Sequence, residues 1–185
     1  VNGLGSVVVA SMTAGGKLSM FFCCPFDAFG STMATYAGQN LGAGKLDRVT
    51  KGIVQCSFVA AGYSVVAAVV MILFGKSFAL LFVDSTEVEI IANVAKLLII
   101  NSLFFIPLAL VNIIRFAIQG LGFGKLAIFA GVAEMVGRSI VGFGFVARFG
   151  FVASPIAWIL ADIFLIPAYA YCIRKLRPII QEKKE

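Results

Sequence analysis

Residues 53–74 read IVQCSFVAAGYSVVAAVVMILF and carry no charged side chain over their whole length. A helix needs about 20 mostly apolar residues to cross the hydrocarbon core of a bilayer, which is about 30 Å thick. This run is too long for an ordinary core helix of a soluble protein and too continuous for the alternating strand of a barrel. We therefore predict that residues 53–74 form a transmembrane helix.

The composition of the whole chain extends this interpretation to all 185 residues. Hydrophobic residues make up 61% of the chain and charged residues 13%, and the mean hydropathy is +1.02. Ordinary soluble domains have about 45–50% apolar and about 25% charged residues. The formal net charge of +6 would suit nucleic acid, but in a membrane protein a basic excess reports which loops face the cytoplasm. We therefore expect an all-α membrane protein with no nucleic-acid partner.

Further apolar runs predict a polytopic bundle of about five to six transmembrane helices. Gly15-Gly16-Lys17 is expected to be a turn, and Pro107 predicts a kink because it removes one backbone hydrogen bond. The chain opens on Val1 without a starting Met, so we expect a fragment whose first helix is truncated. The expected spans are Leu4–Ala14 (short and Gly-rich), Ser19–Gly38, Ile53–Phe74, Ile90–Phe116, Leu126–Ala147 and Val152–Ile173.

Basic residues gather in alternate loops and in the tail, residues 174–185. Lysines and arginines concentrate on the cytoplasmic side of membrane proteins. We therefore expect a multi-pass protein of the cell membrane whose C-terminus and basic tail are cytoplasmic. The basic set comprises Lys45, Arg48, Lys51, Arg115, Lys125, Arg174, Lys175, Arg177, Lys183 and Lys184, and the opposite side holds the acidic stretch with Asp84, Glu87 and Glu89.

Four motifs stand out by their order along the chain. Gln39-Asn40-Leu41-Gly42-Ala43-Gly44 ends the second span, where Gly at the αL position is typical of a helix C-cap. The string Arg115-x-x-x-Gln119-Gly120-x-Gly122 lies between two later spans. Glu134-x-x-x-Arg138 and Pro155-x-x-Trp158 follow. Together these motifs resemble the second six-helix bundle of the multidrug and toxic compound extrusion (MATE) transporters, over essentially the whole chain.

The resemblance implies that residues 1–185 are half of a twelve-helix, two-bundle transporter. It also implies secondary antiport, in which drugs or organic, often cationic, solutes leave in exchange for H⁺ or Na⁺. The expected partners are the small-molecule substrate, the coupling ion, membrane lipid and a missing N-terminal bundle. One alternative is a lipid-linked precursor flippase of the same superfamily. Such a flippase would need a more cationic cavity, whereas Arg138 is the only cation expected in the middle of a span here. Another is a non-transporting gene fragment.

Ionisable residues inside the spans are the first candidates for ion coupling or for the substrate cavity, because charges are costly in a bilayer. Glu134 and Arg138 are four residues apart, so they share a helix face. They form either an ion pair that holds neighbouring helices together, or a coupling site in which Glu134 exchanges protons or cations and Arg138 tunes its pKa. Asp27 lies either in a wet cavity or near the outer interface. Asp162 either takes part in coupling or bonds a neighbouring helix, through Asn101 or Asn112.

Asn101 and Asn112 also bracket Pro107 in the longest span, together with Ser102. A broken helix with amide side chains can coordinate a cation or a polar group of the substrate, but such amides also join helices. The sequence holds no phosphate-binding Gly loop, no nucleophile with a base and no metal-ligand cluster. We therefore expect no enzyme activity, no catalytic or metal site and no cofactor.

Overall fold

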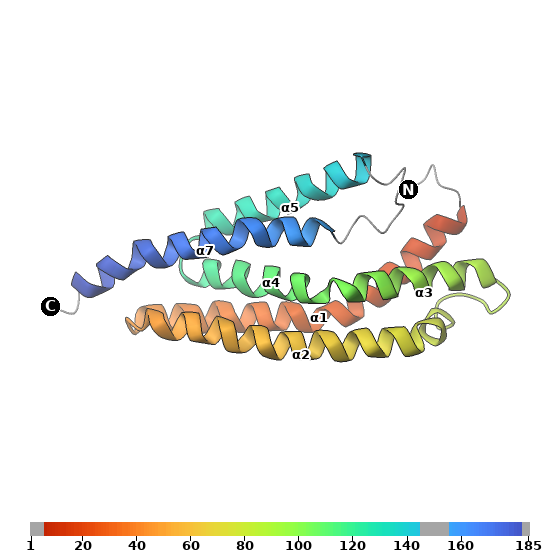
Figure 1. Ribbon diagram of the computed structural model, residues 1–185, viewed down its shortest axis with the longest axis horizontal. Helices are drawn as coiled ribbons and strands as arrows, with labels where there is room; N and C mark the ends of the chain where they lie inside the picture. Colours follow the sequence, from red (N-terminus) through yellow and green to blue (C-terminus); the bar gives the residue numbers. More distant parts are fainter. Residues whose placement is uncertain (1–5, 145–155, 183–185) are drawn as a thin grey trace.

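The computed structural model of the chain describes residues 6–144 and 156–182. The described residues form α-helices that pack lengthwise into an all-α membrane bundle (Figure 1). Within the described residues, α2 is the one helix that passes by itself as a membrane span by length and composition, and α3 and α4 pass together as one bent span. The helices are α1 (Ser6–Gly42), α2 (Leu46–Ala79), α3 (Val88–Leu103), α4 (Phe105–Gly120), α5 (Gly124–Gly144) and α7 (Ile156–Glu182).

Helix α1 organises the bundle because it packs against α2, α3 and α4, while α7 packs against α4 and α5 (Figure 1). The core between α1, α2 and α4 is aromatic. The Phe26 ring is fully buried, and its centroid lies 5.4 Å from those of Tyr63 and Phe105, in edge-to-face arrangements. Such pairs stabilise a core beyond the area they bury.

The first helix differs from the prediction, because α1 runs unbroken from Ser6 to Gly42. The expected turn at Gly15-Gly16-Lys17 is therefore wrong, and so is the division into Leu4–Ala14 and Ser19–Gly38. Glycine disfavours a helix by about 1 kcal/mol relative to alanine. Here Gly15 is buried, and a Cβ at this position would lie 3.0 Å from the Leu97 side chain. Tertiary packing of α3 against α1 therefore overrides the local preference.

The kink predicted from Pro107 is confirmed, because α3 and α4 meet at Phe104 with a bend of 53°. Pro107 is the third residue of α4. The first N–H groups of a helix have no partner within that helix, so the N–H that proline lacks costs no hydrogen bond there. The Phe104 amide donates to the Asn101 carbonyl at 3.0 Å, which closes the end of α3. Beyond the bend, α4 continues to Gly120, four residues past the expected end of the span at Phe116, and includes Arg115.

A second proline, Pro25, lies inside α1 and leaves the helical backbone short of one donor. The Tyr63 hydroxyl of α2 donates to the Phe22 carbonyl, one turn before the proline, at 3.0 Å. A side chain from a neighbouring helix thus supplies a hydrogen bond where the backbone of α1 is weakened, as membrane helices with proline require.

The ends of α1 and α4 repeat one structure, which explains two of the motifs. Gly44 and Gly122 have φ of 67° and 87°, the left-handed region that glycine favours. After α1 the amide of Lys45 donates to the Asn40 carbonyl at 2.8 Å, and after α4 the amide of Phe123 donates to the Ile118 carbonyl at 3.1 Å. Both ends are Schellman motifs, so the prediction of a glycine C-cap after the second span is confirmed.

Glycine also allows α1 and α4 to approach each other closely. A Cβ on Gly120 would lie 2.1 Å from the Ala34 carbonyl oxygen, and one on Gly30 would lie 2.7 Å from the Phe116 ring. Small residues at helix crossings let backbones meet in membrane proteins. The contact fixes α4, and with it Arg115, against α1.

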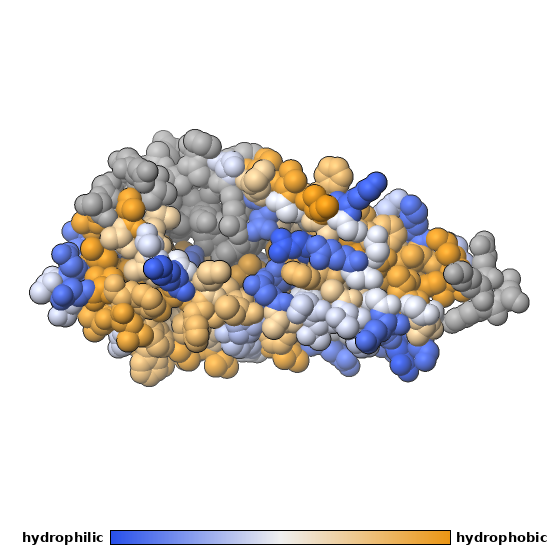
Figure 2. Space-filling view, turned by 180° about the vertical axis from the view of Figure 1, so that it is seen from behind, coloured by the Kyte–Doolittle hydropathy of each residue, from blue (hydrophilic) through white to orange (hydrophobic). Residues whose placement is uncertain are grey.

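The surface and the two ends of the bundle fit a bilayer environment. Phe58 and Leu73 of α2 are 75% and 69% exposed, and hydrophobic residues cover broad stretches of the face in Figure 2. The α1–α2 turn, the α4–α5 turn and the C-terminal end of α7 lie at one end of the bundle, and the α2–α3 connection lies at the other (Figure 1). The basic residues from 174 to 177 continue α7, which is helical to Glu182.

Candidate functional site

A cavity of about 270 Å³ lies between α1, α4 and α5 and brings together several of the predicted residues. Its polar groups come from α1 and from the consecutive helices α4 and α5, so the packing of the bundle and not a local motif builds it. Apolar side chains of α4 complete the wall. The lining residues are Cys23, Asp27, Leu108, Val111, Asn112, Arg115 and Glu134.

Arg115 links the polar groups of this cavity. Its Nη1 lies 3.4 Å from Oε2 of Glu134, and its Nη2 donates to Oδ1 of Asn112 at 3.0 Å. The side chains of Arg115 and Glu134 are 26% and 13% exposed. Because both charges lie mostly out of solvent, each neutralises part of the desolvation cost of the other. Glu134 has further interactions beyond this pair.

Asp27 supplies the second carboxylate of the cavity. It is exposed on α1, and it makes no hydrogen bond or ion pair with any residue that the structure describes. Asp27 precedes Gly42 by 15 residues, which places it about 22 Å along α1 from that helix end at a rise of about 1.5 Å per residue. Glu134 follows Gly124 by ten residues, a depth of about 15 Å. Both carboxylates therefore lie well inside their helices, several turns from the nearer ends.

Cavity size limits what this site can hold. Sites for drug-sized ligands usually measure about 300–1,000 Å³ and are mostly apolar. The present cavity has about 270 Å³ and carries two carboxylates, an amide and a guanidinium. Its size and chemistry fit a small cation with water better than an organic solute.

Asn101 lies elsewhere. Its Nδ2 donates to Oγ of Ser19 at 3.1 Å and so joins α3 to α1, while Ser102 bonds within its own helix to the Ile99 carbonyl at 2.7 Å. The predicted amide cluster around Pro107 is therefore divided, and Asn112 alone reaches the cavity.

Asp162 lies on the buried face of α7, next to Ala161, and is 8% exposed. It does not line the cavity. Its Oδ1 has no hydrogen-bond partner among the described residues. Asn101 and Asn112 bond Ser19 and Arg115, so neither of them supplies the interhelical bond that was one of the two alternatives for Asp162.

Arg138 belongs to α5, but its side chain lies outside what the structure describes, as do Pro155 and the side chain of Trp158. The remaining motif residues are structural. Asn40 Nδ2 bonds the Tyr36 carbonyl at 2.8 Å, and Gly42, Gly44 and Gly120 belong to the two helix ends. The side chains of Gln39 and Gln119 are exposed.

Sequence reasoning missed the role of Arg115 and the presence of Cys23 in the cavity wall. Arg138 is consequently not the sole candidate for a cation within the bundle. The sequence does indicate the contact between Arg115 and Asn112, because the two residues are three positions apart and therefore share a face of one helix. The contact with Glu134 has no such signal, since it depends on how α4 and α5 pack.

The comparisons with known proteins agree with this architecture. The sequence model of the MatE family matches residues 1–144. The chain belongs to the MatE family. A search of curated proteins and a search of solved structures find no match. The MatE chain is therefore a MATE-type membrane transporter protein, and this family consists of transporters and not enzymes.

Proposed function

We propose that the chain is one bundle of a secondary antiporter that exports organic, often cationic, solutes, and that the cavity of Asp27, Asn112, Arg115 and Glu134 binds the coupling H⁺ or Na⁺. Membership of the MatE family supports transport. The observation that carries the coupling role is the presence of two acids from different helices in one small cavity.

The geometry suggests how an ion would change the bundle. Arg115 and an incoming cation compete for Glu134, because both need its carboxylate. When H⁺ or Na⁺ occupies the carboxylate, the bond to Arg115 weakens and α5 is less firmly held to α4. When the cation leaves, the ion pair forms again. This exchange provides two states of one helix contact, which alternating access requires.

The solute needs a larger space than this cavity, so we propose that a second bundle, N-terminal to this one in the complete transporter, forms the substrate path with it. The twelve-helix resemblance and the exposure of Asp27 support this arrangement. We further propose that the protein lies in the cell membrane with its C-terminus in the cytoplasm. Lys45 lies in the α1–α2 turn, Lys125 at the start of α5 and Lys175 in the C-terminal part of α7. These parts of the chain lie at the same end of the bundle (Figure 1), which supports that orientation.

Asp162 is a second proposed coupling residue, because its buried oxygen has no hydrogen-bond partner among the described residues. Buried carboxylates inside membrane bundles commonly belong to proton relays. The flippase alternative gains no support from the cavity, since the charge of Arg115 is balanced by Glu134.

The test is export of a fluorescent cationic dye from cells that express the full-length protein, with the Na⁺ and pH gradients collapsed separately. We expect export to stop when one of the two gradients is removed, which identifies the coupling ion. Export that persists without either gradient, or no export from correctly inserted protein, would contradict the antiporter proposal.

A further inference from the structure

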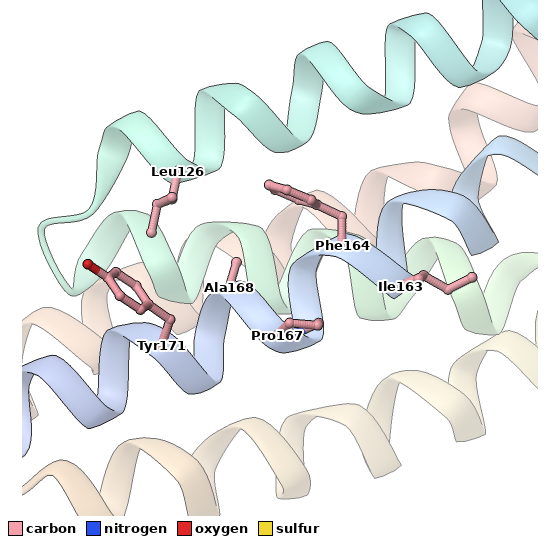
Figure 3. Close-up of a pocket in the computed structure, with 6 residues that line it drawn as sticks. All are labelled: Leu126, Ile163, Phe164, Pro167, Ala168 and Tyr171. Atoms are coloured by element: carbon pink, nitrogen blue, oxygen red, sulfur yellow. The ribbon is translucent and has the colours of Figure 1, made fainter.

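A second concavity is mostly apolar and shares no lining residue with the acidic cavity. It measures about 480 Å³, lies between α5 and α7, and opens to the surroundings. Ile163 and Tyr171 are 64% and 54% exposed along it. Figure 3 shows that Leu126 and Tyr171 approach each other at one end of the groove and that Phe164 points toward α5. The lining residues are Leu126, Ile163, Phe164, Pro167, Ala168 and Tyr171.

The end of this groove at Tyr171 is basic. Lys125 directly precedes Leu126, and Lys175 follows Tyr171 by one helical turn on the same face of α7. The Lys175 ammonium lies 5.9 Å from the centre of the Phe123 ring in the α4–α5 turn, so it reaches toward the N-terminus of α5. Both lysines are exposed, and neither pairs with a carboxylate among the described residues. The positive end of the α5 dipole, at Gly124, adds to this charge.

We propose that the α5–α7 groove binds an anionic phospholipid, whose phosphate lies between Lys125 and Lys175 and whose acyl chain runs between the two helices. The dimensions agree with this occupant. Ile163 and Tyr171 are eight residues apart, which is about 12 Å of helix. One leaflet contributes about 15 Å of hydrocarbon. An acyl chain anchored at the basic end would therefore fill the groove to its far end.

Charge selects this lipid over others. A zwitterionic lipid offers the same acyl chain, but its ammonium opposes the two lysines. A fatty acid also offers an anion and an acyl chain, but it has no glycerol to bond the Tyr171 hydroxyl, which is the polar group of the groove wall. Lysines near a membrane surface each contribute measurably to attraction for anionic lipid, and the attraction weakens with salt.

The experiment is native mass spectrometry of the detergent-purified protein, titrated with palmitoyl-oleoyl phosphatidylglycerol, the matching phosphatidylcholine or palmitate. We expect phosphatidylglycerol to remain bound most tightly. Lys125→Gln with Lys175→Gln should weaken its apparent affinity by about 25-fold, at about fivefold for each lysine. The matched control, Lys45→Gln with Lys51→Gln, removes two exposed lysines that adjoin none of the groove residues and should leave the affinity unchanged.

A second variant, Ala168→Phe, fills the groove without changing its charge and should also reduce phosphatidylglycerol retention. The lysine variants alter only exposed side chains, so they remain decisive even where Ala168→Phe does not fold. Equal retention of phosphatidylglycerol by both lysine double variants would overturn the proposal, as would equal binding of phosphatidylcholine or palmitate. A lipid-free dimer held together through this groove would show that a second copy is the occupant and would also overturn it.

Discussion

Replacing Gly120 by alanine should destabilise the bundle, although alanine is the better helix former. The added Cβ would lie 2.1 Å from the Ala34 carbonyl oxygen. That oxygen belongs to the backbone of α1, so no side chain can rotate away. Helices α1 and α4 would have to separate by roughly 0.9 Å before the contact reached 3.0 Å, the shortest distance that real Cβ atoms normally show.

The expected magnitude follows from two opposing effects. Overpacking a core costs about 1–3 kcal/mol, and alanine regains at most about 1 kcal/mol of helix propensity. The net loss should be about 1–2 kcal/mol, which lowers the Tm by about 2–8 °C in a chain of this size. Gly62→Ala is the matched control, because a Cβ there has nothing within 4 Å, and it should leave the Tm unchanged or raise it.

The assay is thermal unfolding in detergent, followed with a dye that fluoresces on reaction with thiols. Cys172 is fully buried and should react as the bundle opens. A Tm of Gly120→Ala equal to or above that of Gly62→Ala would refute the close approach of α1 and α4.

Three further substitutions test other contacts. Tyr63→Phe removes the hydroxyl that bonds the Phe22 carbonyl beside Pro25, so the same assay should show that the free energy of unfolding falls by about 1 kcal/mol. Tyr171→Phe is the control, and equal Tm values for the two variants would contradict the role of Tyr63. Arg115→Gln should lower the Tm, and adding Glu134→Gln should recover part of the loss because the two side chains pair; strict additivity would show that they do not interact in solution. Asp162→Asn should reduce export from the full-length protein at normal expression, and unchanged export would remove Asp162 from the coupling residues.

Much of the fold could be predicted from the sequence because apolar runs in a bilayer allow few alternatives to helices. The position of α2 followed from residues 53–74, and the bend between α3 and α4 followed from Pro107. These are local properties of the chain. The bounds of α2 were too short in the prediction because Leu46–Ala79 extends past the apolar run into amphipathic turns.

The prediction failed where packing outweighed local preference. Gly15 and Gly16 read as a turn, but the contact between Gly15 and Leu97 forms only when α3 lies against α1. The same limit applied to the site. Asp27 and Glu134 were identified because charges are costly in a bilayer, and Asn112 because it lies near Pro107. That these residues share one cavity with Arg115 depends on the packing of three helices. Asn101 and Asn112 are eleven residues apart, about 16 Å along a helix, so they meet different neighbours on α1 and α4.

The most direct test of the coupling proposal is solute uptake against a gradient in proteoliposomes that contain the full-length protein. Ion-driven accumulation and passive exchange of the same solute should be measured side by side. For Glu134→Gln and for Asp27→Asn, the account predicts that ion-driven accumulation is lost while passive exchange remains, because the substrate path is intact but the ion site is not. Accumulation at the wild-type level in both variants would contradict the assignment of the coupling ion to this cavity.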